Sequence, residues 1–211
     1  MFPPSRLYAI IDAQSLPGRD PAAVARQLLR AGVKILQYRK KGPFTRDDGD
    51  QCCLMARLAR EHSAVFLVND RVDVALVCDA AGVHLGQDDL PPEVARRLLD
   101  ARGGHDKILG FSTHSVEQAR EAGRLPVDYI AIGPVFATAT KENPDPVVGL
   151  ETVASARRVV TKPLVAIGGI TLENARAVID SGADAVAVIG GLLNAADVEG
   201  RAREFLQRLH T

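Results

Sequence analysis

Apolar and polar positions alternate between two kinds of segment along the whole chain. Short apolar runs rich in β-branched residues, typical of buried strands, are followed by segments with apolar residues at helical spacing. The helical segments 21–32 and 171–182 also end in glycine, a common residue just past a helix, and Thr171 is the expected cap of the second segment. The eight runs that we predict as strands are Leu7–Asp12, Ile35–Arg39, Val65–Asp70, Gly82–Gly86, Lys107–Thr113, Tyr129–Val135, Pro163–Gly169 and Ala185–Gly190.

Two of the predicted strands, 163–169 and 185–190, are apolar at nearly every position. Such runs are typical of a parallel sheet covered on both faces, whereas a half-exposed strand alternates apolar and polar residues. Eight strand–helix units in 211 residues give about 26 residues per unit, near the lower limit of a (β/α)8 barrel. The alternative, an open doubly wound sheet, usually stops at about six strands. The pattern therefore predicts an α/β protein with one domain over residues 1–211, a (β/α)8 (TIM) barrel.

Composition and charge narrow the classes of function. The 26 Lys and Arg residues balance 26 Asp and Glu residues, so the formal net charge is zero. A neutral chain lacks a whole-surface attraction to nucleic acid or to an anionic membrane, so we expect neither as a partner. The apolar stretch 185–193 is too short to span a bilayer, and two early prolines argue against a signal peptide. We expect a cytoplasmic protein that acts on small molecules, and the sequence leaves open whether it is a homodimer.

The three cysteines, Cys52, Cys53 and Cys78, do not form the even-numbered framework of a secreted disulfide protein. No two of them have the C-x-x-C spacing that is typical of zinc ligands. We therefore expect three free thiols in a reducing compartment.

Polar residues follow the second predicted strand. Active sites of such barrels lie at the carboxyl ends of the strands, so residues at these ends are candidates for chemistry. Gln37, Arg39 and Lys41 alternate along the chain and share one face if the extended path continues. An amide, a guanidinium and an ammonium on one face form a grip for phosphate, although a solvated basic loop has the same pattern.

Acidic residues follow the third and fourth predicted strands. Asp70 ends one strand, and Asp88 and Asp89 follow the next. The residues alone leave open whether Asp88 or Asp89 is the second carboxylate of the site. Neighbouring strands bring these carboxylates together, and a cation between them relieves their repulsion. Magnesium, held by one or two carboxylates and by substrate phosphate oxygens, fits this arrangement. Asp70 has a second interpretation as the cap of the following helix, with Asp73 completing a capping box.

The last three predicted strands end in residues suited to a phosphate. The loop after the sixth strand contains Thr138, Thr140 and Lys141, although a hydrophilic surface loop has the same composition. Glycine pairs at 168–169 and 190–191 follow the seventh and eighth strands. Glycine lets backbone N–H groups approach an anion, and these two loops often form the phosphate site of such barrels.

Two histidines lie near the predicted strand ends. We expect His84, inside the fourth strand, to be a packed and hydrogen-bonded core residue rather than a catalyst, whereas His114 remains ambiguous. The chain contains no nucleophile elbow, Walker A loop or H-E-x-x-H motif, so the sequence offers no ready protein nucleophile.

The most specific signals are whole segments that occur in a fixed order. They are LYAIID, GVKILQYRKK, VNDRVDVAL, GVHLGQDDLP, LGFSTHS, DYIAIGPVFATATK, PLVAIGGIT and GADAVAVIG. This set closely resembles the thiamine phosphate synthase family, from about Leu7 to the final helix. The resemblance implies a magnesium-dependent (β/α)8 barrel. It also implies an enzyme that joins 4-amino-2-methyl-5-hydroxymethylpyrimidine diphosphate to 4-methyl-5-(2-hydroxyethyl)thiazole phosphate, giving thiamine phosphate and pyrophosphate.

The resemblance also implies a role for each strand end. The residues expected to contact the pyrimidine diphosphate are Gln37, Tyr38, Arg39, Lys40, Lys41, Asn69, Ser112 and Lys141. Asp70 and Asp89 are expected to hold magnesium, so the resemblance selects Asp89 over Asp88. The residues expected around the thiazole phosphate are Thr138, Ala139, Thr140, Gly169, Ile189 and Gly190. The expected catalytic residues, which would stabilise the departing pyrophosphate, are Arg39, Lys41 and Lys141.

The sequence departs from the family pattern at two positions. The family often has serine where Gly190 stands, so one hydroxyl contact to the thiazole phosphate is lost while the backbone N–H remains. The family often has an acid where Lys40 stands, and we expect that side chain to point away from the face of Arg39.

The mechanism that the resemblance implies is dissociative. Electron donation from the aminopyrimidine helps to expel pyrophosphate, and the thiazole nitrogen attacks the resulting carbocation. The protein then has to stabilise the leaving group, position two rings and exclude water, which explains why no protein nucleophile is needed.

Two other functions remain as alternatives. A related barrel, the thiazole tautomerase, typically lacks the acidic pair and the T-x-T-K loop, both of which this chain has at Asp70, Asp89 and 138–141. A non-catalytic barrel that senses thiazole phosphate would need the glycine pairs and neither aspartate. The acidic pair therefore favours the synthase over both.

Overall fold

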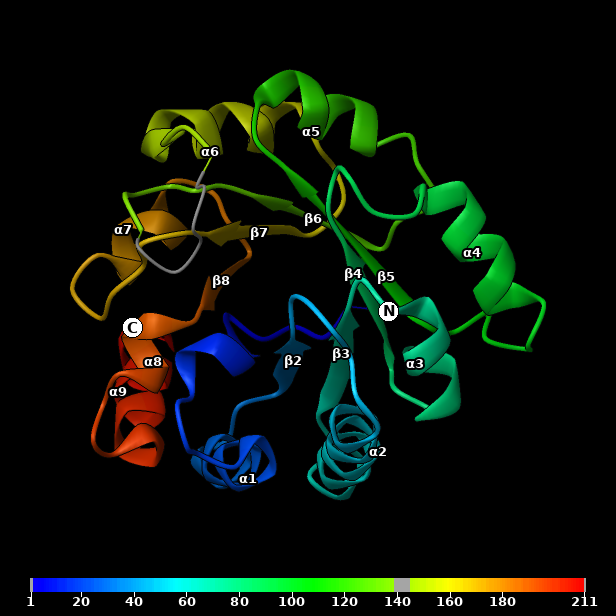
Figure 1. The fold of residues 1–211 in the computed structure, drawn as a ribbon. Helices are drawn as coiled ribbons and strands as arrows, with labels where there is room; N and C mark the ends of the chain where they lie inside the picture. The colour runs from blue at the N-terminus through cyan, green and yellow to red at the C-terminus, as the bar shows by residue number, and fades with distance from the viewer. Residues whose placement is uncertain (1, 139–144, 211) are drawn as a thin grey trace.

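The computed structural model describes residues 2–138 and 145–210, which form a closed parallel barrel (Figure 1). The strands are β1 (Leu7–Asp12), β2 (Ile35–Arg39), β3 (Val65–Asn69), β4 (Gly82–Leu85), β5 (Ile108–Thr113), β6 (Tyr129–Ile132), β7 (Leu164–Ile167) and β8 (Ala185–Val188). Each strand pairs with the next in sequence, and β8 returns to pair with β1. The predicted (β/α)8 barrel fold is confirmed.

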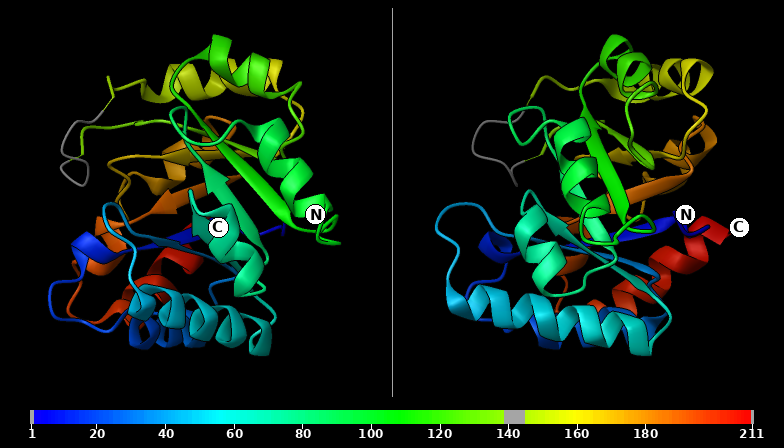
Figure 2. Two further views of the ribbon diagram at one scale, coloured as in Figure 1. Left: turned by 45° about the vertical axis from the view of Figure 1, so that its right-hand side comes forward. Right: turned by 90° about the vertical axis from the view of Figure 1, so that its right-hand side faces the viewer.

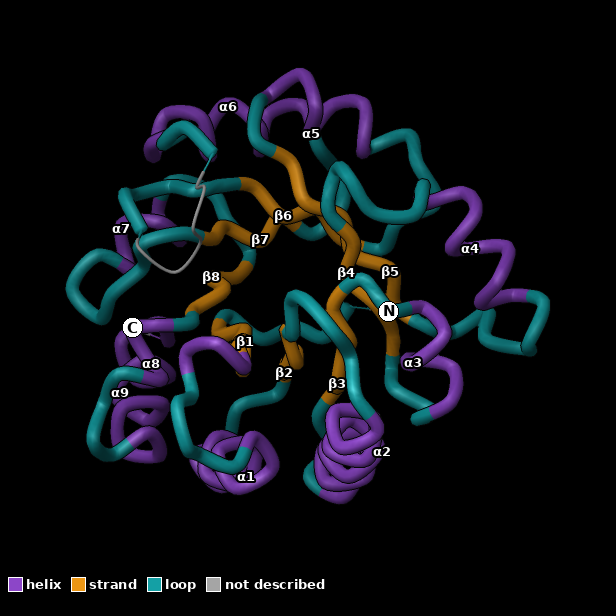
Figure 3. Tube along the Cα trace, viewed as in Figure 1, coloured by secondary structure: helices purple, strands orange, loops and turns teal. Residues whose placement is uncertain are grey.

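Helices enclose the strands, which form the inner ring of the molecule in Figure 3 and are covered from the sides in Figure 2. They are a short 3-10 helix (Ala13–Ser15), α1 (Pro21–Ala31), α2 (Arg46–Glu61), α3 (Val72–Val77), α4 (Pro92–Asp100), α5 (Val116–Ala122), α6 (Gly149–Val159), α7 (Ala175–Asp180), α8 (Gly190–Leu193) and α9 (Val198–His210). Within the described ranges, no helix has the length and apolar character needed to cross a membrane.

Side chains of most strands alternate between two apolar clusters. In β1, Leu7, Ala9 and Ile11 pack between the sheet and the helices, whereas Tyr8 and Ile10 point into the barrel. Both faces are therefore buried, which explains why the strands read as continuous apolar runs. Each fully buried Leu or Ile side chain contributes about 1.5–3 kcal/mol to the free energy of unfolding. The interior cluster consists of Phe2, Tyr8, Ile10, Ile35, Leu67, Ile108, Tyr129, Ala131, Val165, Ala185 and Ala187.

Helix α1 shows how the local sequence sets the boundaries of a unit. Asp20 accepts hydrogen bonds from the N–H groups of Ala22 (3.2 Å) and Ala23 (3.1 Å), which would otherwise lack partners at the helix start. Gly32 ends the helix in the left-handed region at φ 101°, where residues with a Cβ are strained. The helix predicted within 21–32 is confirmed.

Helix α7 is shorter than the predicted segment 171–182. Asn174 rather than Thr171 is its cap residue, and a turn before it is closed by the Thr171 N–H donating to Asn174 Oδ1 (2.8 Å). The predicted threonine cap is therefore wrong, because Asn174 satisfies the backbone group that a longer helix would have used.

Candidate active site

The carboxyl ends of the strands surround a cavity of about 400 Å³. Because the strands are parallel, the residues that follow them gather at one end of the barrel. The predicted site residues that line this cavity are Gln37, Arg39, Lys41, Asn69, Asp70, Asp89, Ser112, Thr138 and Ile189. The predicted site residues that lie in the described chain but do not line it are Tyr38, Lys40, Gly169 and Gly190. Three further predicted residues lie outside the described residues: Ala139, Thr140 and Lys141.

Asp70 follows β3 in a left-handed backbone conformation with a φ of 62°. Few residues other than glycine adopt this region, although Asp tolerates it better than most. The Asp70 N–H donates to the carbonyl of His84 (2.8 Å), which fixes the turn against β4. Arg71 is the N-cap of α3, and no described side chain caps that helix. The interpretation of Asp70 as a helix cap is therefore wrong, and its carboxyl is left for the cavity.

The carboxyls of Asp70 and Asp89 lie close enough together to shift each other's pKa. Burial and the neighbouring Asp89 raise the pKa of Asp70 to about 6. Burial opposes ionisation of Asp89 as well, but hydrogen bonds from Asp70 and from the Gly86 N–H (2.8 Å) outweigh it and lower the pKa of Asp89. The pair thus holds one proton more readily than two separate carboxyls would.

The donor set at this pair fits a divalent cation bound partly by a ligand. Within the described ranges, no group of three or more His, Cys, Asp and Glu side chains comes together to form a complete protein cage. Two adjacent carboxylates beside an open cavity are instead the arrangement that magnesium uses when substrate and water complete its coordination. Asp88 and Asp89 both line the cavity, but Asp88 is exposed whereas Asp89 lies beside Asp70, so Asp89 is the better placed of the two and its metal role remains a prediction.

Two cationic side chains line the same cavity as the acidic pair. Lys41 Nζ lies 2.5 Å from Asp70 Oδ2, and Arg39 Nη1 lies 2.6 Å from Asp12 Oδ1. The side chain of Lys41 is about half exposed, whereas that of Arg39 is 12% exposed. The ammonium can therefore exchange its partner for a ligand, while the guanidinium is held in a nearly buried ion pair.

Asp12 is a site residue that sequence reasoning missed. Its side chain is fully buried at the end of β1, where it accepts from Arg39 and from the Ser15 hydroxyl (2.8 Å). The strand register places Asp12 directly beside Arg39. One signal in the sequence could have identified Asp12. It is an acid at the end of the apolar run of β1, and the next strand carries the predicted basic face.

Tyr38 and Lys40 turn away from the cavity. The Tyr38 hydroxyl donates to Asp48 Oδ1 (3.0 Å), and Lys40 Nζ lies 3.2 Å from the same oxygen. Both residues therefore pack against the first turn of α2, as the alternation along β2 requires. The orientation of these two side chains gives no support to their predicted contact with a diphosphate, which remains a prediction.

Asn69 carries a polar group without a partner. It ends β3, is 8% exposed and lines the cavity, and its Nδ2 has no hydrogen-bond partner among the described residues. A buried donor that lacks an acceptor costs about 1–3 kcal/mol, so such groups are rare unless a ligand completes them. Asn69 therefore points to a ligand acceptor at this end of the cavity.

A chain of hydrogen bonds crosses the barrel interior below the cavity. The Gln37 amide donates to the Tyr8 hydroxyl (2.5 Å), which is bonded to the Tyr129 hydroxyl (2.9 Å). Tyr129 is also bonded to His84 Nδ1 (2.7 Å), and His84 Nε2 is bonded to the Ser112 hydroxyl (2.8 Å). Burial raises the pKa of both tyrosines, so their hydroxyls stay protonated. The chain thus orients two predicted ligand contacts, Gln37 and Ser112, from opposite sides.

Two features hold Tyr129 in this chain. The Phe2 ring lies 4.5 Å from the Tyr129 ring, centroid to centroid, and belongs to the cluster inside the barrel. A Cβ at Gly110 would lie 2.4 Å from the tyrosine hydroxyl, so only glycine leaves room for it there. His84 is buried and bonded through both ring nitrogens, in agreement with its expected role as a core residue.

Small residues and backbone predominate at the ends of β7 and β8, whereas Asp145, between β6 and α6, brings a carboxyl to the cavity. Gly168 and Ile189 line the cavity, and Gly168 and Gly169 both have positive φ (101° and 63°). A Cβ at Gly169 would lie 2.4 Å from the carbonyl oxygen of Ala137, so the two loops touch through their main chains. Thr138 borders the same part of the cavity. This half therefore offers small residues, glycine backbone and a hydroxyl, the elements of a phosphate cradle.

Comparison with known proteins places this geometry in context. Residues 7–192 match the family model described as thiamine monophosphate synthase. A thiamine-phosphate synthase of Koribacter versatilis is 48% identical over 98% of this chain and 96% of its own length. The corresponding enzyme of Syntrophomonas wolfei is 43% identical over 95% of this chain and 94% of its own length.

Solved structures give the same result. A thiamine phosphate pyrophosphorylase from Pyrococcus furiosus superimposes with a TM-score of 0.87 at 36% identity, covering 97% of this chain and 95% of that one. A 3-hexulose-6-phosphate synthase is also similar, with a TM-score of 0.67, but at 16% identity that likeness shows the fold alone.

Proposed function

The chain belongs to the thiamine-phosphate synthase family of transferases, and we propose that its cavity joins a hydroxymethylpyrimidine diphosphate to a hydroxyethylthiazole phosphate. The observation that carries this proposal is the Asp70–Asp89 contact with Lys41 Nζ 2.5 Å from Asp70. A coupled acidic pair beside a cation suits a metal-bound diphosphate, whereas a thiazole phosphate alone would need neither carboxylate.

The diphosphate belongs at the ends of β2 to β5. Lys41 and Arg39 supply positive charge there, and Lys41 is exposed enough to leave Asp70 for a phosphate oxygen. The unpartnered Asn69 amide and the Ser112 hydroxyl supply neutral donors on the same side. Gln37, held by Tyr8, is placed to meet the pyrimidine.

Magnesium is the metal that this proposal assigns to Asp70 and Asp89, where it would neutralise diphosphate charge and ease the loss of pyrophosphate. Lys41, which is about half exposed, would turn from Asp70 to a phosphate oxygen and stabilise the leaving group together with Arg39. The buried Asp12 keeps the guanidinium oriented, so little reorganisation accompanies the reaction. Lys141 lies outside the described residues, and its catalytic role remains a prediction.

The thiazole phosphate belongs at the ends of β6 to β8. Gly168 and Ile189 provide backbone there, Gly169 follows directly after Gly168, and Thr138 provides a hydroxyl. The second ring then lies across the cavity from the diphosphate, where its nitrogen can reach the carbon that pyrophosphate leaves. A dissociative step needs positioning and dry surroundings rather than a protein nucleophile, which agrees with the residues that line the cavity.

The test supplies both substrates to the purified protein, with and without magnesium, and follows thiamine phosphate and pyrophosphate. We expect both products to appear in equal amounts only when magnesium is present. Isomerisation of a thiazole phosphate without coupling would replace this proposal with a tautomerase. Tight binding of thiazole phosphate with no turnover of either substrate would indicate a sensor.

A further inference from the structure

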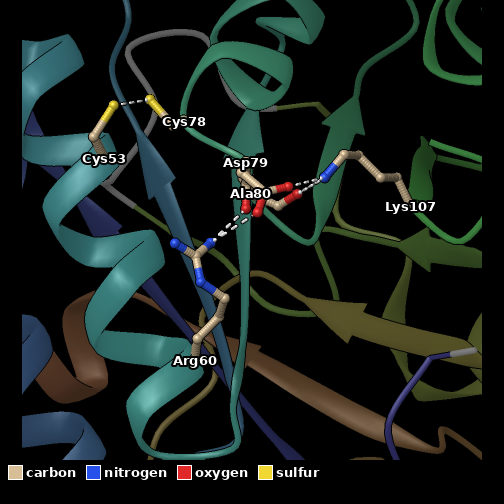
Figure 4. Close-up of polar contacts among 6 residues, drawn as sticks. All are labelled: Cys53, Arg60, Cys78, Asp79, Ala80 and Lys107. Carbon is tan, nitrogen blue, oxygen red and sulfur yellow. Dashed lines mark hydrogen bonds and ion pairs between the residues drawn. The ribbon is translucent and has the colours of Figure 1, made fainter. Parts of the chain in front are cut away.

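Two thiols from different helices meet on the outer side of the barrel. Cys53 on α2 and Cys78 just after α3 are 25 positions apart in the sequence, and their Sγ atoms lie 2.7 Å apart (Figure 4). A disulfide bond is about 2.05 Å long, so the two sulfurs are about 0.7 Å from bonding distance. We infer that Cys53 and Cys78 form a thiol–disulfide exchange site, which a small-molecule disulfide converts into an intramolecular link between α2 and α3.

The segment that carries Cys78 is anchored independently of the sulfur contact. Arg60 Nη1 donates to the carbonyl oxygen of Asp79 (2.7 Å), and Lys107 Nζ donates to Asp79 Oδ1 (2.9 Å), as Figure 4 shows. Arg60 lies on α2, the helix that also carries the other thiol. The Cys78 Sγ lies 3.6 Å from the carbonyl oxygen of Gly49, also on α2. The meeting of the sulfurs therefore follows from how α3 ends against α2, and not from two loose side chains.

The two thiols differ in access, which sets the order of the reaction. Cys53 is exposed, whereas Cys78 is buried, and burial together with the adjacent Cys53 raises the pKa of Cys78. The Cys53 thiolate is therefore the group that a dissolved disulfide reaches first.

Exchange proceeds in two balanced steps. Cys53 Sγ attacks one sulfur of the small disulfide, forming a mixed disulfide and releasing one small thiol. Cys78 Sγ then attacks Cys53 Sγ and releases the second small thiol. Two protein thiols are oxidised by two electrons and one small disulfide is reduced to two thiols. The contact of the sulfurs gives the second step a high effective concentration.

Cys52 provides an internal comparison. It is fully buried in the core between the sheet and the helices, and burial raises its pKa to about 12. Its thiol therefore stays protonated and out of reach of a dissolved disulfide. Of the three thiols, Cys53 and Cys78 should react and Cys52 should remain.

The link should be compatible with the cavity. Helix α2 follows the loop that carries Lys41, and α3 follows Asp70 and Arg71. The Lys41–Asp70 pair is present in the same structure in which the sulfurs touch. Neither Cys53 nor Cys78 lines the cavity. Bond formation therefore keeps the site geometry and leaves turnover unchanged, while it shortens the free loops of the unfolded chain.

The experiment treats the full chain with oxidised glutathione and follows thiols, mass and thermal unfolding. We expect the thiol count to fall from three to one, with a Cys53–Cys78 cross-linked peptide after proteolysis. Closing a loop of this size should raise the melting temperature by roughly 5–10 °C, reversed by a reducing agent. The Cys52→Ala control should still form the link, whereas Cys78→Ser should stop with one glutathione on Cys53.

Several outcomes would overturn the inference. These are three thiols that persist under oxidised glutathione, a stable glutathione adduct on the unmodified chain, or a cross-link that joins two chains. Peptide mapping of the unmodified chain decides among them even if a cysteine variant fails to fold. Arg60→Gln refines the test, because loosening the Asp79 anchor should slow the second step several-fold without changing the first.

Discussion

The two halves of the cavity differ in the groups that they offer to an anion: charged side chains in one half and glycine backbone in the other. At the ends of β2 to β5, charged side chains are already paired with one another, as in Lys41–Asp70 and Arg39–Asp12. At the ends of β7 and β8, glycine and backbone replace charge, and the loops touch so closely that a single Cβ would not fit at Gly169. In the first half, the groups that can bind an anion are held in ion pairs with other side chains. In the second half, the conformation of the main chain forms the binding surface.

This difference predicts how each half responds to substitution. Removing a carboxylate from the charged half leaves the barrel core intact, so the loss should fall on turnover. Adding a methyl group to the glycine half displaces backbone, so the loss should fall on stability and on binding together. The following substitutions separate these two behaviours.

The largest effect should come from Asp89→Ala. If Asp70 and Asp89 hold magnesium as proposed, this substitution removes one of the two ligands, and magnesium-dependent formation of thiamine phosphate should fall by at least about 100-fold. The melting temperature should change little, because the side chain borders the cavity rather than the core. Asp88→Ala is the matched control, since Asp88 is exposed and should cost little activity. Equal losses in both variants at limiting magnesium would refute the metal assignment.

Gly169→Ala should affect binding and folding at once. The new Cβ would lie 2.4 Å from the Ala137 carbonyl oxygen, in a backbone with a φ of 63°. We expect a loss of about 3 kcal/mol or more in the free energy of unfolding, and a KM for thiazole phosphate at least about 10-fold higher. Gly18→Ala is the control, because its φ is 70° but no described atom lies within 4 Å of the added Cβ.

For Gly18→Ala we expect a loss of about 1 kcal/mol in the free energy of unfolding and no change in KM. If the two alanine variants behave alike, the backbone contact between the loops does not matter and the contrast between the two halves fails.

Tyr129→Phe should give a moderate effect on the charged half. It breaks the hydrogen-bonded chain between Tyr8 and His84 and removes one hydrogen-bond partner from each of these two buried groups. The free energy of unfolding should fall by about 1–3 kcal/mol, and kcat/KM for the pyrimidine diphosphate by about 5–20-fold. Tyr38→Phe removes a hydroxyl that points to Asp48 instead, so its KM should stay near that of the unmodified protein.

If KM changes as much in Tyr38→Phe as in Tyr129→Phe, Tyr38 contacts the diphosphate in the complex, although its hydroxyl is bonded to Asp48 in this structure. Such a result would restore the contact that family resemblance implies for Tyr38.

Gly190→Ser should give the smallest effect, and a favourable one. The added Cβ would lie 3.2 Å from Asn194 Nδ2, a distance that a small side-chain shift can accommodate. A hydroxyl there would return the contact that the family often has, and the KM for thiazole phosphate should fall about 2–3-fold. The measurement is the KM at saturating pyrimidine diphosphate. An unchanged or higher KM would show that the backbone cradle needs no hydroxyl.

The fold was predictable because its signal is local. Each strand is buried on both faces, so it reads as an unbroken apolar run, and eight such runs define the barrel without knowledge of distant contacts. The same local signal located the strand ends and thus Asp70, Asp89 and Lys41, which the structure brings together. The roles assigned to these residues remain predictions.

What escaped prediction depends on contacts between distant segments. Asp12 looked like the end of an apolar run, because its pairing with Arg39 depends on the register of two strands. Tyr8 and Tyr129 looked like core residues, because a hydroxyl buried in a barrel gains meaning only from the partner across it. The sulfur contact likewise requires that α3 end against α2, which spacing alone does not specify.

The left-handed backbone of Asp70 places stability and chemistry in conflict at one position. Glycine or asparagine would fit a φ of 62° with less strain, and either would remove a carboxyl whose ionisation burial and Asp89 oppose. Directed evolution for heat resistance alone would therefore enrich substitutions at this position. Its products would be robust barrels without turnover, so a selection for activity has to accompany every round.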